Sequence, residues 1–519
     1  MPLPNNNTTF PPVNLQSTYT RYALYDAWYS GDTSRLANIY YTQIYNPFDP
    51  SSSFWARRGA KERSTAVHIP IAADISATSS AMLFSETPKC EIPGANEPEA
   101  PTDLITIQAR LEQIIKEGSV FSRLSNAAEI CSALGGVYLK VDWDDELADY
   151  PILSVAQPDA AIPEFRHGIM VACTFWKELS NGDASANKTN RPIRNFPTAP
   201  RTTKLVNNSD SDTVYRYIEH HDKGYILSAL YKGTSDNIGV QVDVTEHPET
   251  AHLKGRESLA TGIDGLLCRY VPNFLPNRQD RGSYLGQSDY AGSESLMDSL
   301  DEVYTSLMRD IRLGQGRIML PESFLTRDDN GNISFDVDQD AYIAINQIAG
   351  DENAKITYNQ FEIRAEQHIR SATELIVNIV TNAGYSPQTF GIDINGSAES
   401  GTALNIRERK SFITTSKKAN YWKPVIEDML ELMMMVDYIH LSSGIKPMRP
   451  QVEMQDSVQQ DIGQVATSIE LMNRAQAVSL RTKVSLLHPD WTNAQIESEV
   501  EALQDEAGMS LPDVDVTAV

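Results

Sequence analysis

The sequence predicts an α+β protein with a long mixed body, followed by a helix, a small β-rich insert and two further helices. Three observations predict this class and this order. Apolar residues recur every three or four positions in several long segments, which is typical of one buried helix face. In other segments they alternate with polar residues, which is typical of half-buried strands. The chain has 519 residues, too many for one hydrophobic core, so we expect several domains.

The mixed body comprises residues 1–286 and begins with a polar arm over residues 1–17 that is flexible or extended. Helices are predicted at 19–30, directly after Asp32 or Thr33, around 71–82, and at 104–115 and 120–134. Strands are predicted at 137–143, 152–155, 169–175, 214–220 and 225–231. Between the last two strands, residues 222–224 form a predicted hairpin turn of sequence Asp-Lys-Gly.

The first helix after the body lies within residues 287–315 and carries one apolar stripe. The stripe has steps of four, three, four and four residues and consists of Leu296, Leu300, Val303, Leu307 and Ile311. Ser288 suits the N-cap position, and Asp298 and Asp301 are expected beside the stripe. These residues predict an amphipathic rod of roughly 37 Å, at about 1.5 Å per residue.

A second rod, within residues 363–385, is predicted to pack beside the first. Its apolar residues are Ile369, Leu375, Ile376 and Ile379, and Gly384 suits the position that caps a helix at its carboxyl end. Between the rods, residues 316–362 contain strand-like runs and a strong turn signal at 328–331. The two rods therefore flank a compact β-rich insert.

A glycine- and serine-rich loop over residues 386–401 leads into a third, longer helix within residues 402–449. Pro424 inside this helix predicts a kink rather than an end, because the helical pattern resumes after it. The carboxyl-terminal residues 450–519 are predicted to be helical, with a frayed acidic tail.

The loop and the start of the third helix form the most informative part of the sequence. The candidate site residues in the loop are Ile392, Asp393, Ile394, Asn395, Gly396, Ser397 and Ser400, and those in the helix are Arg407, Arg409 and Lys410. Glycine and short polar residues favour a mobile loop. With Lys417 and Lys418, the helix holds the densest basic run in the chain. Composition alone favours a solvated helix face over a binding site.

The sequence gives little support for an enzyme. It contains neither a phosphate-binding P-loop nor a dinucleotide-binding glycine motif. Three groups suggest metal ligands, but each has a stronger structural explanation. His220 and His221 are adjacent in a strand and point to opposite faces. Residues 336, 338 and 340 are aspartates, yet the calcium loop's glycine and glutamate are missing. Residues 142–146 hold four carboxylates, which favour a solvated turn. We therefore expect no catalytic, cofactor or metal site.

Charge and cysteine content further limit the classes of protein to which the chain can belong. The chain has 69 Asp and Glu residues against 44 Lys and Arg residues, a formal net charge of −25, which disfavours tight binding to phosphates. The four cysteines are far apart, which argues against a zinc site and a disulfide framework. We expect no signal peptide and no membrane span, since no window reaches 18 uncharged apolar residues. A protein of the reducing cytoplasm is the resulting expectation.

Several passages, in order, resemble one known family. They are YDAWYSGDTSRLANIYY, HIPIAADISATSSAMLFSETP, GGVYLKVDW, QPDAAIPEFRHG, VPNFLPN, GQSDYAGSESLMDSLDEVYTSLMRDI and NGSAESGTALNIRER. On these passages the chain resembles the portal proteins of tailed bacteriophages, of the siphovirus type. The likeness covers nearly the whole chain and is weakest at 179–212 and in the tail.

The resemblance implies a portal fold with seven parts. These are a wing (1–286), a first stem helix (287–315), a clip (316–362), a second stem helix (363–385), a tunnel loop (386–401), a long kinked helix returning to the wing (402–449), and a crown with its tail (450–519). It implies a virion protein, assembled in the host cytoplasm, with twelve copies in a ring at one capsid vertex. Double-stranded DNA would pass through the ring during packaging and ejection, without sequence-specific binding.

The resemblance also implies partners. The clip would dock the terminase large subunit and later the head–tail adaptor, and the ring would contact the major capsid protein and a scaffold, with no membrane. The terminase motor would hydrolyse ATP, which agrees with the missing P-loop. An acidic bore would repel duplex phosphates, so that DNA slides. The alternatives are an acidic metal-dependent α+β enzyme and another ring-forming virion connector such as an adaptor.

Overall fold

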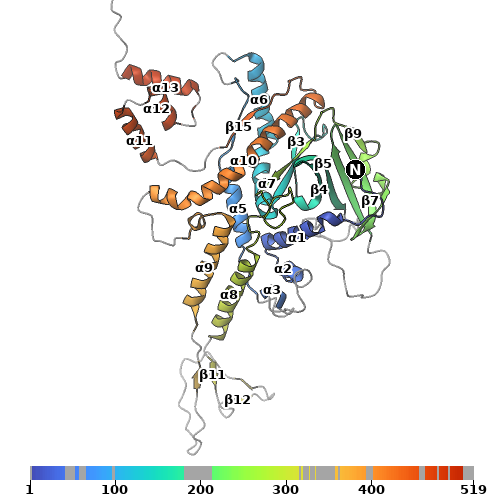
Figure 1. Ribbon diagram of the computed structural model, residues 1–519, viewed down its shortest axis with the longest axis vertical. Coiled ribbons are helices and arrows are strands. Elements are labelled where there is room, and N and C mark those ends of the chain that lie inside the picture. The colour runs from blue at the N-terminus through green and yellow to red at the C-terminus, as the bar shows by residue number, and fades with distance from the viewer. Residues whose placement is uncertain are drawn as a thin grey trace, which may run out of the picture. The chain divides into compact units, whose positions relative to one another are not determined.

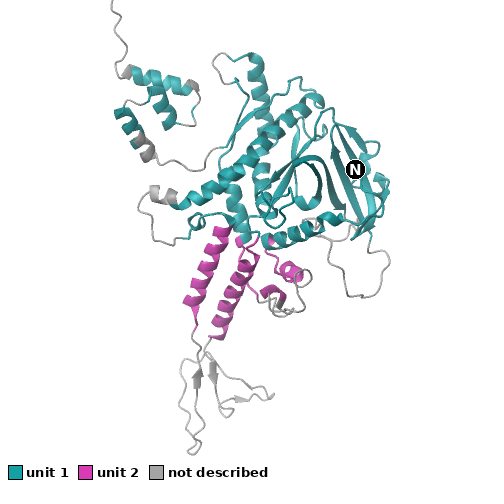
Figure 2. Ribbon diagram, viewed as in Figure 1, with its two compact units in different colours: residues 1–29, 72–291, 383–519 teal, residues 30–71, 292–382 magenta. Residues whose placement is uncertain are grey.

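The computed structural model shows an α+β protein, as the sequence predicts, with 51% of the described residues helical and 19% in strands. It describes residues 3–40, 53–57, 66–95, 100–179, 213–314, 317–319, 326–327, 333–334, 357–359, 363–392, 401–454, 462–475, 478–488, 491 and 493–506. The chain forms two compact units (Figure 2). Unit 1 comprises residues 1–29, 72–291 and 383–519, and unit 2 comprises residues 30–71 and 292–382.

A six-stranded antiparallel sheet forms one part of unit 1 (Figure 1). In spatial order its strands are β4 (Ala161–Arg166), β5 (Ile169–Leu179), β6 (Val214–Asp222), β7 (Tyr225–Thr234) and β8 (Asn237–Val242), and β9 (Ser258–Ala260) also pairs with β7. Asp222 lies opposite Tyr225, so Lys223 and Gly224 form the two-residue turn that the sequence predicts. Gly224 has a φ of +85°, which such turns favour.

A second sheet in unit 1 packs against helices. Its strands, in the order β10, β2 and β3, are Cys268–Pro272, Gly136–Asp142 and Ile152–Ala156. Helices α6 (Thr102–Glu117) and α7 (Val120–Leu134) join strand residues such as Val137 and Leu139 in the largest core cluster. Helix α7 ends where Gly135 adopts a φ of +91°. The structure thus confirms the predicted change from helix to strand, since α7 ends at Leu134 and β2 begins at Gly136.

The amino-terminal arm is extended and bound to the six-stranded sheet. The main-chain N–H of Asn7 donates to Gly239 at 2.6 Å, and that of Phe10 donates to Asp236 at 3.0 Å. The Phe10 ring packs edge-on against Trp176. Helix α1 (Gln16–Ser30) follows, and α5 (Ile71–Phe84) begins directly after Pro70. The arm therefore covers the edge strand β8, which would otherwise expose unpaired backbone groups.

Two further elements return to unit 1 from the end of the chain. Helix α10 (Gly401–Ile439) runs through Pro424 without ending, as predicted. Its second half contributes Trp422 and Met433 to the largest core cluster. Strand β15 (Gln451–Glu453) pairs with β1 (Lys89–Glu91), a pairing that the sequence did not suggest. Helices α11 (Ile462–Arg474), α12 (Leu480–Leu487) and α13 (Asn493–Glu506) follow β15 in the chain.

Unit 2 contains the two predicted rods as α8 (Glu294–Leu313) and α9 (Ala365–Ala383), drawn as neighbours in Figure 2. Asp310 of α8 accepts hydrogen bonds from Arg364 at 3.3 Å and from His368 at 3.1 Å. The prediction that α8 begins after Ser288 is wrong. The helix begins at Glu294, because Ser288 is buried in unit 1, where its hydroxyl donates to the carbonyl of Ser132.

The predicted packing residues of the rods divide into two groups. Leu300, Leu307 and Ile379 are buried, and Leu296, Val303, Leu375 and Ile376 are half-buried. Ile311 and Ile369 are instead 43% and 57% exposed. Within one chain these two isoleucines therefore do not form a buried seam.

Asp298 and Asp301, which the sequence places beside the apolar stripe, are both buried. Asp298 accepts from the main-chain N–H of Phe54 at 2.7 Å, in α3 (Phe54–Arg57). Asp301 accepts from Trp55 and His68 side chains. Burial raises the pKa of both carboxyl groups. These bonds tie the segment around α3 to α8, which explains why residues 30–71 belong to unit 2 rather than to the body 1–286.

Other elements of unit 2 are short. Helix α2 (Thr33–Ile39) has the predicted Asp32 cap, whose carboxylate accepts from two main-chain N–H groups. Strand β11 (Arg317–Met319) pairs with β14 (Thr357–Asn359), and β12 (Thr326–Arg327) pairs with β13 (Ile333–Ser334). The predicted turn at 328–331 and the aspartates at 336, 338 and 340 lie outside the described residues.

A polar cluster lies in unit 1 where β2, β5, β6 and β10 meet. Lys140 donates to Glu219 at 2.9 Å, and the His221 ring is 2.5 Å from the same carboxylate. His220 points the other way and bonds Thr174, so the two histidines face opposite sides as predicted. Burial alone would lower the pKa of His221, but the hydrogen bond to Glu219 outweighs it and raises that pKa.

We expect His221 to make stability depend on pH. Because its folded pKa lies above the unfolded value of about 6.5, its stabilising effect is complete below that pH and is lost as pH rises through the folded pKa. The difference in melting temperature between the wild type and His221→Gln should therefore shrink from about pH 5.5 to 8. The exposed His252→Gln serves as control. A difference that does not change with pH would contradict the assignment.

Candidate functional site

The candidate site lies in unit 1, where the chain leaving α9 meets the first half of α10. Of the predicted loop residues, the structure describes Ile392, whereas Asp393, Ile394, Asn395, Gly396, Ser397 and Ser400 lie outside the described residues. Arg407, Arg409 and Lys410 lie in α10. We call residues 384–392, which lead from α9 to the loop, the loop base.

The loop base begins with a sharp turn. Gly384 adopts a φ of +99° directly after α9, which confirms its predicted capping position. A Cβ atom at this position would lie 2.9 Å from the hydroxyl of Thr414, so the close approach also requires glycine. That hydroxyl donates to the Gly384 carbonyl at 2.6 Å. The turn thereby places the loop base directly against α10.

Hydrogen bonds continue along the loop base. The main-chain N–H of Ser386 donates to the Ser411 hydroxyl at 2.8 Å, and its side chain donates to the Arg407 carbonyl at 2.6 Å. Thr389 bonds the Ser411 hydroxyl at 2.8 Å. A 3-10 helix, η7 (Pro387–Phe390), fills the remaining span, and the Ile392 N–H donates back to the Pro387 carbonyl. The base is therefore fixed up to the residue where the described segment ends.

The basic residues of α10 have two different environments. Arg409, Lys410 and Lys417 are exposed, and Arg407 is half-buried. Partial burial lowers the pKa of Lys410. Lys418 is instead only 1% exposed. The expectation that the whole basic run is a solvated face is therefore wrong at Lys418, because this side chain points into the protein.

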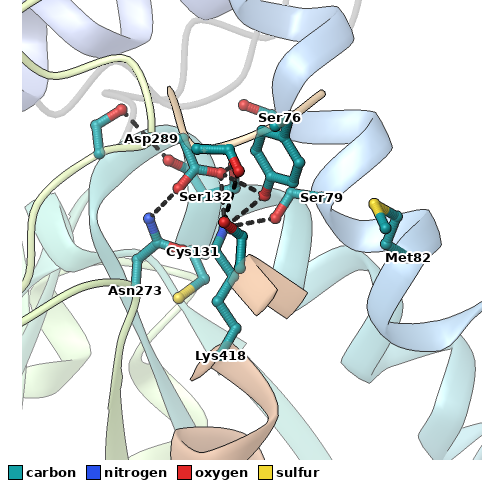
Figure 3. Close-up of polar contacts among 12 residues, drawn as sticks. Ser76, Ser79, Met82, Cys131, Ser132, Asn273, Asp289 and Lys418 are labelled. Atoms are coloured by element: carbon teal, nitrogen blue, oxygen red, sulfur yellow. Dashed lines mark hydrogen bonds and ion pairs between the residues drawn. The ribbon is translucent and has the colours of Figure 1, made fainter. Parts of the chain in front are cut away.

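Lys418 has three buried hydrogen-bond partners (Figure 3). Its ammonium donates to Ser79 of α5 at 2.6 Å, to the Asp289 carboxylate at 2.6 Å and to the Tyr385 hydroxyl at 3.0 Å. An ammonium has three N–H donors, so all are used. The ring of Phe274 also lies 5.0 Å from the ammonium nitrogen.

The side chain of Asp289 is completely buried and has four hydrogen-bond partners. Its carboxylate accepts from Asn273 at 2.6 Å, from Ser132 at 2.6 Å and from the Tyr385 hydroxyl at 3.1 Å, in addition to Lys418. Burial raises the pKa of Tyr385 well above its ordinary value, and the Asp289 carboxylate raises it further. Tyr385 therefore keeps its proton and donates it to Asp289 while accepting from Lys418. We call these five residues, together with Ser79, the Lys418 cluster.

The Lys418 cluster was not predicted, although the sequence contains a signal for it. Ser411, Thr414, Lys418 and Trp422 are all buried and follow steps of three, four and four residues. This spacing matches one helix face. The signal is hidden because three of the four residues are polar, so that a search for apolar stripes misses them.

Comparison with protein families decides between the interpretations of the chain. Residues 14–513 match the family model for phage portal proteins, SPP1 Gp6-like. The chain belongs to this portal protein family. No curated protein matched the sequence. A portal protein is structural rather than enzymatic, and membership implies an oligomeric ring with a role at the capsid. The match therefore favours neither the acidic enzyme nor a different connector.

Among the described residues, no group of three or more His, Cys, Asp or Glu side chains is arranged to hold a metal ion. The carboxylates at 142–146 follow β2, where Asp142 pairs with Lys140 and Asp144 accepts from the Glu146 N–H. None of the helices in the described part combines the length and apolar composition needed to cross a bilayer.

We expect Lys418→Met to destabilise the portal protein strongly and its neighbour Lys417→Met hardly at all. Loss of the ammonium leaves the Asp289 charge buried and uncompensated, which costs about 3–5 kcal/mol. Lys417 is exposed, so its loss should change stability by less than about 0.5 kcal/mol. Urea denaturation followed by circular dichroism measures both. Equal effects of the two substitutions would contradict the assigned role of the buried pair.

Proposed function

We propose that this portal protein forms a ring of twelve copies at one capsid vertex, through which duplex DNA enters during packaging and leaves during ejection. In this proposal residues 1–286 form the wing, 287–315 and 363–385 the stem helices, 316–362 the clip and 450–519 the crown. Residues 386–401 form the tunnel loop, and 402–449 the long helix behind it. The clip docks the terminase large subunit and then the head–tail adaptor, and the ring contacts the major capsid protein and a scaffold.

One observation carries the proposal beyond family membership: the loop base is fixed to α10 next to exposed basic residues. Thr414, Ser411 and the Arg407 carbonyl all bind the loop base, which leads directly into the predicted tunnel loop. Arg409 and Lys410 lie within one helical turn of this contact. A loop that borders a channel needs such a fixed origin, because otherwise it could not hold a defined width.

The charge of the chain suits passage rather than binding. Twelve copies of a chain with a formal charge of −25 give −300, which repels the phosphates of duplex DNA at one charge per about 1.7 Å of axis. In that setting a small number of exposed cations, contributed once per copy by Arg409 and Lys410, form a weak ring of attraction. Such a ring biases the position of DNA without trapping it, because only a few phosphates are neutralised at a time.

Neutralising these cations should change DNA handling and leave the ring intact. We expect Arg409→Gln with Lys410→Gln to alter DNA packaging efficiency or DNA retention in filled particles, and to weaken the salt dependence of packaging. The matched control is Lys254→Gln with Arg256→Gln, which removes the same charge at two exposed positions near β9. Nuclease-protected DNA per particle is measured. Loss of rings in the first variant, seen by native mass spectrometry, would instead assign a structural role.

The exposed isoleucines of the stem helices provide a second test. Ile311 and Ile369 expose 43% and 57% of their surfaces in one chain. In the proposed ring, a neighbouring copy of the chain packs against these two side chains. We expect Ile311→Asp with Ile369→Asp to reduce the fraction of rings at a given concentration. Asn378→Asp, which adds a charge at an exposed polar position of α9, should leave it unchanged. Native mass spectrometry gives both fractions, and unaltered ring formation in the double variant would refute the packing proposal.

A further inference from the structure

We propose that Lys418 is the positioning residue of the tunnel loop: its ammonium fixes the loop base to α10 and to the segment that precedes α8. The inference rests on the proposed function only in that residues 393–400 border a channel. The contacts that carry it lie entirely within unit 1.

The first step is that one ammonium joins segments that are far apart in the sequence. Asp289 lies five residues before α8 begins, Tyr385 lies two residues after α9 ends, and Ser79 lies within α5. The distances from the ammonium to these three side chains are 2.6, 3.0 and 2.6 Å. The chain passes between the two units directly after residue 291 and directly before residue 383. Lys418 therefore joins, within unit 1, the segment that ends at residue 291 to the segment that begins at residue 383.

The second step is that α10 contacts the loop base at three levels on one face. Ser411 accepts from Ser386, and Thr414 donates to Gly384. Lys418 donates to Tyr385, which lies between Gly384 and Ser386 in the sequence. Because these positions are three and four residues apart, their side chains point the same way. Every residue from Gly384 to Ser386 is thus bonded to the helix, and the described segment ends six residues later at Ile392.

The third step is the unequal strength of these contacts. The Ser411 and Thr414 bonds join neutral groups, whereas the Lys418 contacts involve an ammonium and a carboxylate that are both buried. Charge-assisted hydrogen bonds are roughly twice as strong as neutral ones. Bulk water does not reach either side chain, since the two are 1% and 0% exposed. Lys418 is therefore the contact whose loss frees the loop base most.

The experiment uses the mildest change that separates the loop base from this contact. Tyr385→Phe removes one hydroxyl and leaves the Lys418–Asp289 pair in place. The matched control is Tyr231→Phe, which also removes one hydroxyl, bonded to the Pro4 carbonyl in the sheet part of unit 1. A spin label at Ile392→Cys reports on the end of the loop base in the full-length assembled protein. Three native cysteines are buried, and burial raises the pKa of Cys90 to about 12, so the label is selective.

We expect Tyr385→Phe to increase the mobile fraction of the label about tenfold, which corresponds to about 1.4 kcal/mol and to the loss of a hydrogen bond to charged groups. Tyr231→Phe should leave the spectrum unchanged. Electron paramagnetic resonance line shapes measure the mobile fraction, and melting temperatures taken on the same samples show whether the effect is local. A merely structural role would lower the melting temperature without mobilising the label.

An unchanged label in Tyr385→Phe rings overturns the positioning role. Lys418→Met provides a second arm if folding permits it, and it should mobilise the label at least as much as Tyr385→Phe. Failure of the channel proposal would give a different result. Either the labelled protein, otherwise wild type, would form no rings, or a bulky adduct in place of the label at Ile392→Cys would leave DNA packaging normal. The two failures are therefore distinguishable.

Discussion

The buried contact between Lys418 and Asp289 determines where four distant segments of unit 1 meet. Two charges taken out of water lose several kcal/mol of solvation each, and the attraction between them offsets that loss only when the geometry and the surrounding hydrogen bonds are complete. Here they are complete, since the ammonium has three partners and the carboxylate has four. A different arrangement of these segments would leave a charge without a partner, so the contact selects one arrangement.

Local sequence signals predict much of the fold. Helix α7 and the hairpin between β6 and β7 lie where periodicity and turn residues place them, because both depend on near neighbours in the chain. The pairing of β1 with β15 was not predicted, since it joins residues about 360 positions apart and leaves no local trace. The start of α8 was misplaced for a related reason. Ser288 and Asp289 suit a helix start, but their side chains are used by unit 1.

The candidate site was predicted only in part. The residues around Arg407 adjoin the loop base, but composition alone cannot separate Lys417 from Lys418. The same limit applies to Asp298 and Asp301, which look like solvent-facing carboxylates and instead accept main-chain N–H groups from a remote segment. In each case the charged side chain is buried because a specific partner exists, and the partner lies too far along the chain to be found from spacing.

Ordering a residue of the chain costs about 1–2 kcal/mol of conformational entropy. Fixing both ends of a connecting segment, such as the one between Ile392 and α10, limits the distance that the segment can reach. One end is the base from Gly384 to Ile392, and the other is the start of α10. Since α10 also carries Lys418, Ser411 and Thr414, a single helix fixes both ends. A shift of α10 would therefore carry both of these ends together, rather than change the distance between them.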